Sequence, residues 1–274
     1  PELLLAGGTQ KATLYRNDSP IGGALKFTAV TAGVELDRVT GAYPLDIDSD
    51  GILDLVVLRS GEDVVLRGLG QCQFTRANET WGFDGRALWS TAFAATWEQG
   101  QDWPTLAIGT YTDVTQDAFP WGSCTPNALY RPKGQGFAAP LDLKPSFCSL
   151  SMLFTDWNRS GTPSLRVSND REYYKGGSEQ MWHIAPNQAP SLYMADEGWK
   201  PLKIWGMGIA STDVNGFFTI KNVPTGQYRL TSTYLGYDTA SVPVNLSAGA
   251  TLSFRLLLNK SSIGLREVEV LGAK

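Results

Sequence analysis

Three aspartates alternate along one short stretch of the chain, at Asp46, Asp48 and Asp50, and Gly51 and Asp54 follow them. Calcium binds six to eight oxygen atoms at roughly 2.3–2.6 Å, and closely spaced carboxylates around a glycine turn supply such oxygens. Without a cation, the like charges of these side chains would repel one another in a folded loop. The residue types and their spacing therefore predict a calcium site.

The predicted shell combines side-chain and backbone oxygens. Its members are Asp46, Asp48, Asp50 and Asp54, with a backbone carbonyl near Ile52. An EF-hand is disfavoured, because the twelfth position from Asp46 is Val57, where that motif needs a bidentate glutamate. The apolar run 55–58 indicates a buried strand rather than a helix after the loop. The alternative is an acidic surface turn that holds no ion.

A second stretch repeats this spacing with fewer charges. Asp156, Asn158 and Ser160 occupy the positions of the three alternating aspartates, and Gly161 occupies that of the glycine. One carboxylate with neutral oxygens makes a weak calcium site, since affinity follows ligand charge. A purely structural turn is the favoured alternative here. The stretch 92–109 repeats the order of the first loop and its strands but lacks most of the ligands, and no ion is expected there.

The elements that must position these loops are strands. The 29 glycines and 15 prolines are spread through 274 residues, and no long helical periodicity interrupts them, which predicts an all-β fold. Residues 41–74 follow the order strand, aspartate loop, strand, turn, strand, and the order returns more weakly in 92–131 and 153–167. We expect a partial β-propeller of about three to four blades in 1–211 and a small, incomplete β-sandwich in 212–274.

Composition excludes several classes of function. A hydrophobic content of 42% supports a sizeable core, and a net charge of -4 argues against nucleic-acid binding. No run of 18 apolar residues is present, so no transmembrane segment is expected. The single histidine, His183, lies in a strand-like context without a nucleophile elbow. We therefore expect no catalytic residues and no enzymatic activity; the alternative is a carbohydrate-active enzyme that uses paired carboxylates.

The three cysteines, Cys72, Cys124 and Cys148, show no metal-ligand spacing. If the protein is exported, Cys124 is expected to pair with Cys148, which leaves Cys72 free. If the protein is cytosolic, all three are expected to be buried thiols.

Residues 1 to about 216 resemble the FG-GAP/VCBS β-propeller repeats, most closely the cartilage-acidic-protein group. The resemblance is carried by Asp46-x-Asp48-x-Asp50-Gly51-x-x-Asp54-Leu55, by the recurring Leu-Tyr-Arg at 14–16 and 129–131, and by Trp205-Gly206-Met207-Gly208-Ile209-Ala210. It implies a secreted or cell-surface binding scaffold that calcium stabilises. Such propellers usually have about seven blades, so the propeller here is expected to be incomplete.

Residues 212–274 resemble the carboxypeptidase-regulatory-like domain, a transthyretin-like sandwich at the N-terminus of many TonB-dependent outer-membrane receptors. The motif residues are Thr212-Asp213-x-x-Gly216-x-Phe218-x-Ile220, Val223-Pro224-x-Gly226-x-Tyr228 and Gly236-Tyr237. Strands are expected at Ala240 to Leu246 and at Thr251 to Leu258. The first strands of the sandwich are missing, and the ending 265–272 resembles the segment that precedes a receptor plug.

The two patterns meet at Asp213-Val214-Asn215-Gly216, which both families share. A fusion or a truncated reading is favoured over a natural two-domain protein. The expected function is a non-enzymatic, calcium-binding scaffold for extracellular or cell-surface recognition of a protein or glycan ligand, outside a bacterial cell or in its periplasm. The alternative is a periplasmic appendage of a TonB-dependent receptor in nutrient uptake.

Overall fold

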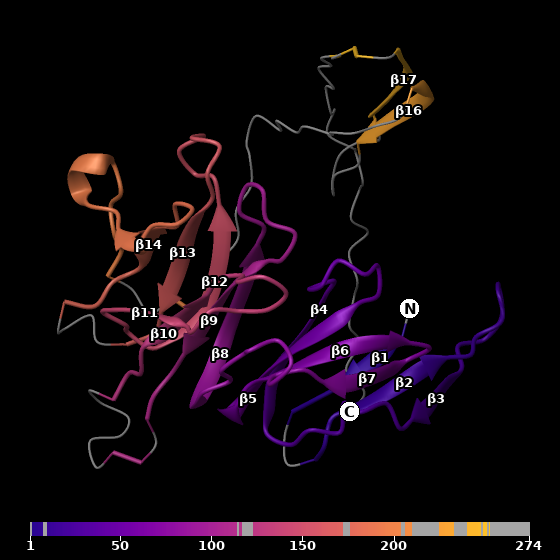
Figure 1. Cartoon of the computed structure of the whole chain (residues 1–274), viewed down its shortest axis with the longest axis horizontal. Coiled ribbons are helices and arrows are strands. Elements are labelled where there is room, and N and C mark those ends of the chain that lie inside the picture. Colours follow the sequence, from indigo (N-terminus) through magenta and orange to yellow (C-terminus); the bar gives the residue numbers. More distant parts are fainter. Residues whose placement is uncertain are drawn as a thin grey trace, which may run out of the picture. The chain divides into compact units, whose positions relative to one another are not determined.

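The structure is a computed structural model of the whole chain (Figure 1), and it divides into two compact units, Pro1–Ser211 and Thr212–Lys274. The division falls where the two sequence patterns meet. The structure describes residues 2–7, 10–113, 115–116, 123–171, 176–203, 206–209, 225–232, 240–247, 249–250 and 252.

Strands make up the first unit. Its strands are β1 (Leu3–Leu5), β2 (Thr13–Asn17), β3 (Phe27–Val30), β4 (Val39–Leu45), β5 (Asp54–Glu62), β6 (Val64–Gly70), β7 (Gln73–Arg76), β8 (Ala87–Thr96), β9 (Thr105–Thr110), β10 (Asn127–Tyr130), β11 (Leu141–Leu143), β12 (Ser149–Thr155), β13 (Ser164–Asn169), β14 (Gln180–His183) and β15 (Ser191–Leu192). One short 3-10 turn, η2 (Ala195–Glu197), follows β15. The described residues contain no α-helix, so the all-β prediction is confirmed.

The strands form antiparallel meanders in which neighbours in sequence pair with one another. The runs β4 to β7, β8 to β11 and β12 to β15 each contain four strands in this order, and β1 to β3 form a sheet of their own. The first two runs share one sheet, because the end of β5 also pairs with β8 at Ser60↔Trp89 and Glu62↔Ala87. Short turns between paired strands account for the glycines and prolines that punctuate the sequence.

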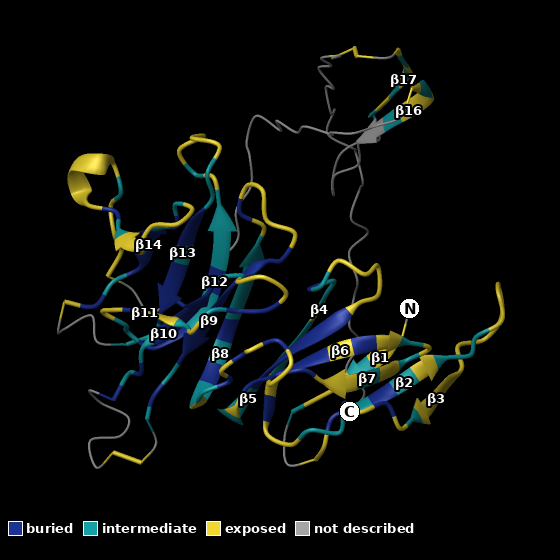
Figure 2. Cartoon of the chain, in the orientation of Figure 1, coloured by how far each residue is buried: buried dark blue, intermediate teal, exposed yellow. Residues whose placement is uncertain are grey.

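The core lies in three layers between successive meanders. On β5, Val56 and Leu58 belong to the layer shared with β8 to β11, whereas Leu55 and Val57 belong to the layer shared with β1 to β3. The third layer joins the β8 to β11 meander to the β12 to β15 meander and includes Leu129 on β10. Because successive side chains point to opposite faces, a strand that is buried on both faces is apolar throughout. Figure 2 shows the buried strands β9 and β13 in dark blue.

The successive meanders share buried faces in sequence order. The described residues form no closed ring, however, and the propeller itself stays a prediction. No helix among the described residues has the length and apolar character that crossing a membrane requires.

The described part of the second unit is one hairpin. Strands β16 (Gly226–Ser232) and β17 (Ala240–Leu246) pair in antiparallel register, with Tyr228 opposite Val244 and Leu230 opposite Val242. The expected strand at Ala240 to Leu246 is therefore present. The expected strand at Thr251 to Leu258, and most of the motif residues before Gly226, lie outside the described residues.

Candidate metal site

The predicted calcium loop connects the paired strands β4 and β5. Leu45 pairs with Asp54, so the intervening residues must reverse the chain within a tight loop. The backbone does so with left-handed conformations at Ser49 (φ 58°) and Gly51 (φ 84°). The second of these explains the glycine, because glycine adopts positive φ without the steric cost that a Cβ atom brings.

The loop brings Asp46, Asp48 and Asp50 together. One carboxylate oxygen from each lies within 4.8 Å of the others. The Gly51 N–H donates to Asp46 Oδ2 at 3.0 Å, and the Ile52 N–H donates to Asp50 Oδ1 at 2.8 Å. This backbone hydrogen bond is the main cause that lowers the pKa of Asp50, so the ionised form is favoured. These contacts hold the carboxylates of Asp46 and Asp50 in place beside that of Asp48.

Two oxygens of this group are buried without a hydrogen-bond partner among the described residues. They are Asp46 Oδ1 and Asp48 Oδ1. The Asp48 side chain is only 10% exposed. A buried carboxylate oxygen without a donor is costly, because it has lost water and gained nothing in return. A bound cation would remove this cost, so the two oxygens are the most direct structural sign of a metal site.

Arg67 on β6 lies against the same group. Its Nε lies 2.9 Å from Asp48 Oδ2, and one of its terminal nitrogens lies 3.1 Å from Asp50 Oδ2. The guanidinium therefore offsets part of the negative charge of the loop. Arg67 is not among the site residues that the sequence predicts. The signal that could have found it is the arginine of the recurring Leu-Tyr-Arg, which corresponds to Leu66-Arg67 in this meander.

Asp54 has a different environment from the other three aspartates. It is fully buried, and it lies outside the group that could hold a metal. Its Oδ2 accepts the Ile47 N–H at 2.7 Å, and its Oδ1 accepts the Gly68 N–H at 2.8 Å. Burial raises the pKa of this carboxyl. Asp54 thus fastens both ends of the loop to the sheet, and the structure brings it to the support of the site rather than among its ligands.

Two further residues complete the surroundings of the loop. A Cβ atom at Gly68 would meet the Leu53 carbonyl oxygen at 2.2 Å, so only glycine allows β6 to pass this close to the loop. The Ser49 hydroxyl donates to the Asp102 carbonyl at 2.8 Å and so connects the loop to the next meander. The hydrogen bond that the structure records for Ile52 is made by its N–H. That the Ile52 carbonyl binds a metal ion stays a prediction.

The second loop has the backbone conformation of the first. Arg159 (φ 57°) and Gly161 (φ 80°) take the places of Ser49 and Gly51. Asp156 accepts the backbone N–H groups of Ser160 at 2.8 Å and Gly161 at 2.9 Å. Asn158 and Ser160 add weak contacts to the same turn. The three predicted weak ligands therefore lie together, and most of their described contacts serve the turn, as the structural alternative expects; Asn158 Nδ2 also donates to the Tyr193 hydroxyl at 3.4 Å.

The three meanders share one further position. In each meander a basic residue directly follows the residue that pairs with the second position of the preceding strand. These basic residues are Arg67, Arg131 and His183. Each pairs with a nearby carboxylate: Arg131 Nε lies 2.8 Å from Glu98 Oε1, and His183 Nε2 lies 2.8 Å from Glu197 Oε1. The basic side chain is thus a repeated feature, and among the described ion pairs Arg67 is the one of the three that joins two carboxylates of an aspartate loop.

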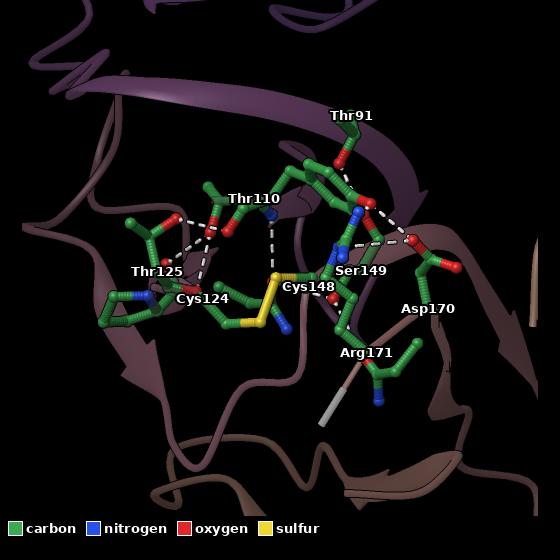
Figure 3. Close-up of a disulfide and its surroundings, with 12 residues drawn as sticks. Thr91, Thr110, Cys124, Thr125, Cys148, Ser149, Asp170 and Arg171 are labelled. Carbon is green, nitrogen blue, oxygen red and sulfur yellow. Dashed lines mark hydrogen bonds and ion pairs between the residues drawn. A yellow bond between two sulfur atoms is a disulfide. The ribbon is translucent and has the colours of Figure 1, made fainter. Parts of the chain in front are cut away.

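Cys124 and Cys148 form a disulfide with an S–S distance of 2.02 Å (Figure 3), and Cys72 is free. The bond joins the β9–β10 connection to the β11–β12 connection. Beside it, the Thr110 hydroxyl donates to the Thr125 carbonyl at 2.9 Å, and the Thr91 hydroxyl donates to the Ser149 carbonyl at 2.5 Å. The disulfide therefore lies in a hydrogen-bonded region between the second and third meanders.

A family model for the CarboxypepD_reg-like domain matches residues 207–270. The match supports the resemblance that the sequence analysis finds for the C-terminal part of the chain. No curated protein matches the chain.

Proposed function

We propose that this chain is a non-enzymatic, calcium-binding β-sheet scaffold that acts in recognition outside the cytoplasm. The observation that carries the proposal is the group formed by Asp46, Asp48 and Asp50, with two buried carboxylate oxygens that have no partner among the described residues. Calcium is the cation whose preference for several oxygen ligands in a flexible geometry this group suits best.

The role of the ion in this proposal is structural. The loop closes the hairpin of β4 and β5, and β5 contributes to two of the three core layers. An ion that binds only the folded loop adds to stability by mass action. Calcium at extracellular concentration would thus stabilise the folded sheets, which would then bind a protein or glycan ligand. Extracellular calcium sites work at dissociation constants of about 0.1–1 mM, which needs no more than a few carboxylates.

The disulfide supports the proposed location. Disulfides form and persist in secreted, surface and periplasmic proteins and are rare in the reducing cytosol. The bond between Cys124 and Cys148 therefore favours an extracellular protein or a protein of the bacterial cell envelope.

The test is a calcium titration of the whole chain by isothermal calorimetry, with Asp48→Ala as the variant. We expect one site in the natural chain and none in Asp48→Ala. A magnesium titration is the control, because magnesium demands a rigid octahedral shell and is expected to bind more weakly. An unchanged calcium isotherm in Asp48→Ala would overturn the assignment of the site.

The match of residues 207–270 favours a second candidate function. Domains of this family occur in TonB-dependent receptors and in cell-surface proteins, so the chain would act as a periplasmic appendage of a receptor in nutrient uptake. The full reading frame of the parent gene tests this candidate. Continuation into an outer-membrane receptor after residue 274 is the expected result for the appendage, and a stop codon there would contradict it.

A further inference from the structure

The carboxylate oxygens of the loop differ in what they already bind. Asp46 Oδ2 and Asp50 Oδ1 each accept a backbone N–H from the loop itself. Asp48 Oδ2 and Asp50 Oδ2 face the guanidinium of Arg67, whereas Asp46 Oδ1 and Asp48 Oδ1 have no partner among the described residues. An incoming ion therefore finds two free oxygens, and it must compete with Arg67 for the third carboxylate.

Asp50 is the residue for which that competition is direct. Its Oδ1 is held by the Ile52 N–H at 2.8 Å, and its Oδ2 receives Arg67 at 3.1 Å. A calcium ion that gathers six or more oxygens needs a ligand from Asp50 in addition to the two free oxygens. Both oxygens of Asp50 already have a partner, and the one that Arg67 holds is the one that a solvent-exposed side chain can release.

Arg67 is able to release Asp50 at small cost. Its side chain is 45% exposed and the Asp50 side chain is 27% exposed, whereas Asp48, its other partner, is 10% exposed. Ion pairs at such exposure contribute little to stability, because solvent can take up the released charge. Among the described ion pairs, none joins Arg67 to an acid outside this loop. The described ion pairs of the guanidinium are thus with the aspartate loop alone, and its side chain is partly exposed to solvent.

We infer that Arg67 is a built-in competitor that sets the calcium affinity of the loop. In the absence of the ion its guanidinium bridges Asp48 and Asp50 and keeps the carboxylates from repelling one another. When calcium binds, Arg67 withdraws from Asp50 Oδ2 toward solvent, and its charge still opposes the ion. This inference rests on the proposed calcium site and concerns the strength of binding there. It places the site among weak, extracellular-type calcium sites.

Calorimetric titration of Arg67→Gln with calcium chloride tests the inference. Removing one positive charge beside a divalent ion is expected to lower the dissociation constant by about tenfold, because Coulomb repulsion in a strongly screened surface site is removed. Arg67→Met, a second neutral side chain of similar length, is expected to give the same gain. Urea unfolding of each variant in chelator verifies that the fold is retained.

Arg16→Gln is the matched control. Arg16 also forms an ion pair with an aspartate, Asp18, at 2.7 Å, but it lies on β2 in another sheet. The Arg16→Gln substitution removes the same charge from an exposed ion pair. The calcium affinity of this variant is expected to equal that of the natural chain.

The outcomes separate the inference from the proposed function. If the natural chain binds calcium and Arg67→Gln binds it with the same or lower affinity, the inference is overturned and the proposed function stands. An equal gain in Arg16→Gln would overturn it as well, because net charge alone would then set the affinity. Binding by Arg67→Gln but not by the natural chain would support the competition and overturn the proposed function. Binding by neither protein would overturn both.

Discussion

Asp54 Oδ1 accepts the Gly68 N–H at 2.8 Å, and this hydrogen bond joins the end of the aspartate loop to β6. The other oxygen of Asp54 accepts the Ile47 N–H at 2.7 Å at the beginning of the loop. A single buried carboxylate thus holds the loop closed from inside the sheet. The neighbouring Asp48 and Asp50 face outward to Arg67, so the four aspartates divide into one support and three candidate ligands.

This division predicts different consequences for Asp54→Ala and for changes at the candidate ligands. Asp54→Ala leaves two buried N–H groups without an acceptor, which is expected to cost about 3 kcal/mol of unfolding free energy. The loss should appear in chelator as well as in calcium, because the carboxylate serves the sheet. Urea unfolding under both conditions measures it. A loss that is confined to calcium would instead make Asp54 a ligand.

Asp63 predicts a pH dependence of stability. It is buried at the turn between β5 and β6, and burial raises its pKa to about 7. Its Oδ1 accepts the Arg59 N–H at 2.8 Å, and its Oδ2 accepts the Ser90 hydroxyl at 2.6 Å. The folded state therefore holds a proton at pH values where the unfolded chain has lost it. The resulting stabilisation is complete below about pH 4 and is lost as the pH rises to 7, by about 1.4 kcal/mol for each unit by which the pKa is raised.

Asp63→Asn tests this account. The amide oxygen can accept the Arg59 N–H, and the amide nitrogen can donate to the Ser90 hydroxyl oxygen, so the packing is retained without a titrating group. In urea unfolding, the free energy of unfolding of the natural chain should fall as the pH rises from 5 to 8. The fall should be smaller in the variant. Equal slopes in the two proteins would exclude Asp63 as the source.

The disulfide predicts a redox dependence of stability. Cys124 and Cys148 are separated by 24 positions in the sequence, and a loop of this size restricts the unfolded chain by roughly 3 kcal/mol. The double variant Cys124→Ser/Cys148→Ser is expected to lose about this amount in urea unfolding. Cys72→Ser controls for the chemical change at a free cysteine. An unchanged stability in the double variant would show that the bond does not form in the natural chain.

Local features of the sequence predicted much of the fold, because they depend on neighbours along the chain. The glycine and proline punctuation gave the all-β prediction, and alternating apolar residues placed a strand at Ala240 to Leu246, where β17 lies. The spacing of Asp46, Asp48 and Asp50 was enough to bring the three together, since one loop contains them all.

The remaining features of the site depend on strand register. The spacing of residues along the sequence does not determine that register. Asp54 reaches Gly68 only because β5 pairs with β6, with Leu55 opposite Leu66. The same register brings Arg67 to the loop. From the sequence, Asp54 was indistinguishable from the other aspartates, and Arg67 was only part of a repeated tripeptide. Closure of the sheets into a propeller likewise depends on long-range packing, and it stays a prediction.

In the proposed function, calcium stabilises the fold through the group of Asp46, Asp48 and Asp50. The most direct test is thermal unfolding of the whole chain and of Asp48→Ala, each in millimolar calcium and in chelator. We expect calcium to raise the melting temperature of the natural chain and to have little effect on the variant, while the two proteins unfold at similar temperatures in chelator. A melting temperature of the natural chain that calcium does not change, or an equal loss in both conditions for Asp48→Ala, would contradict the claim.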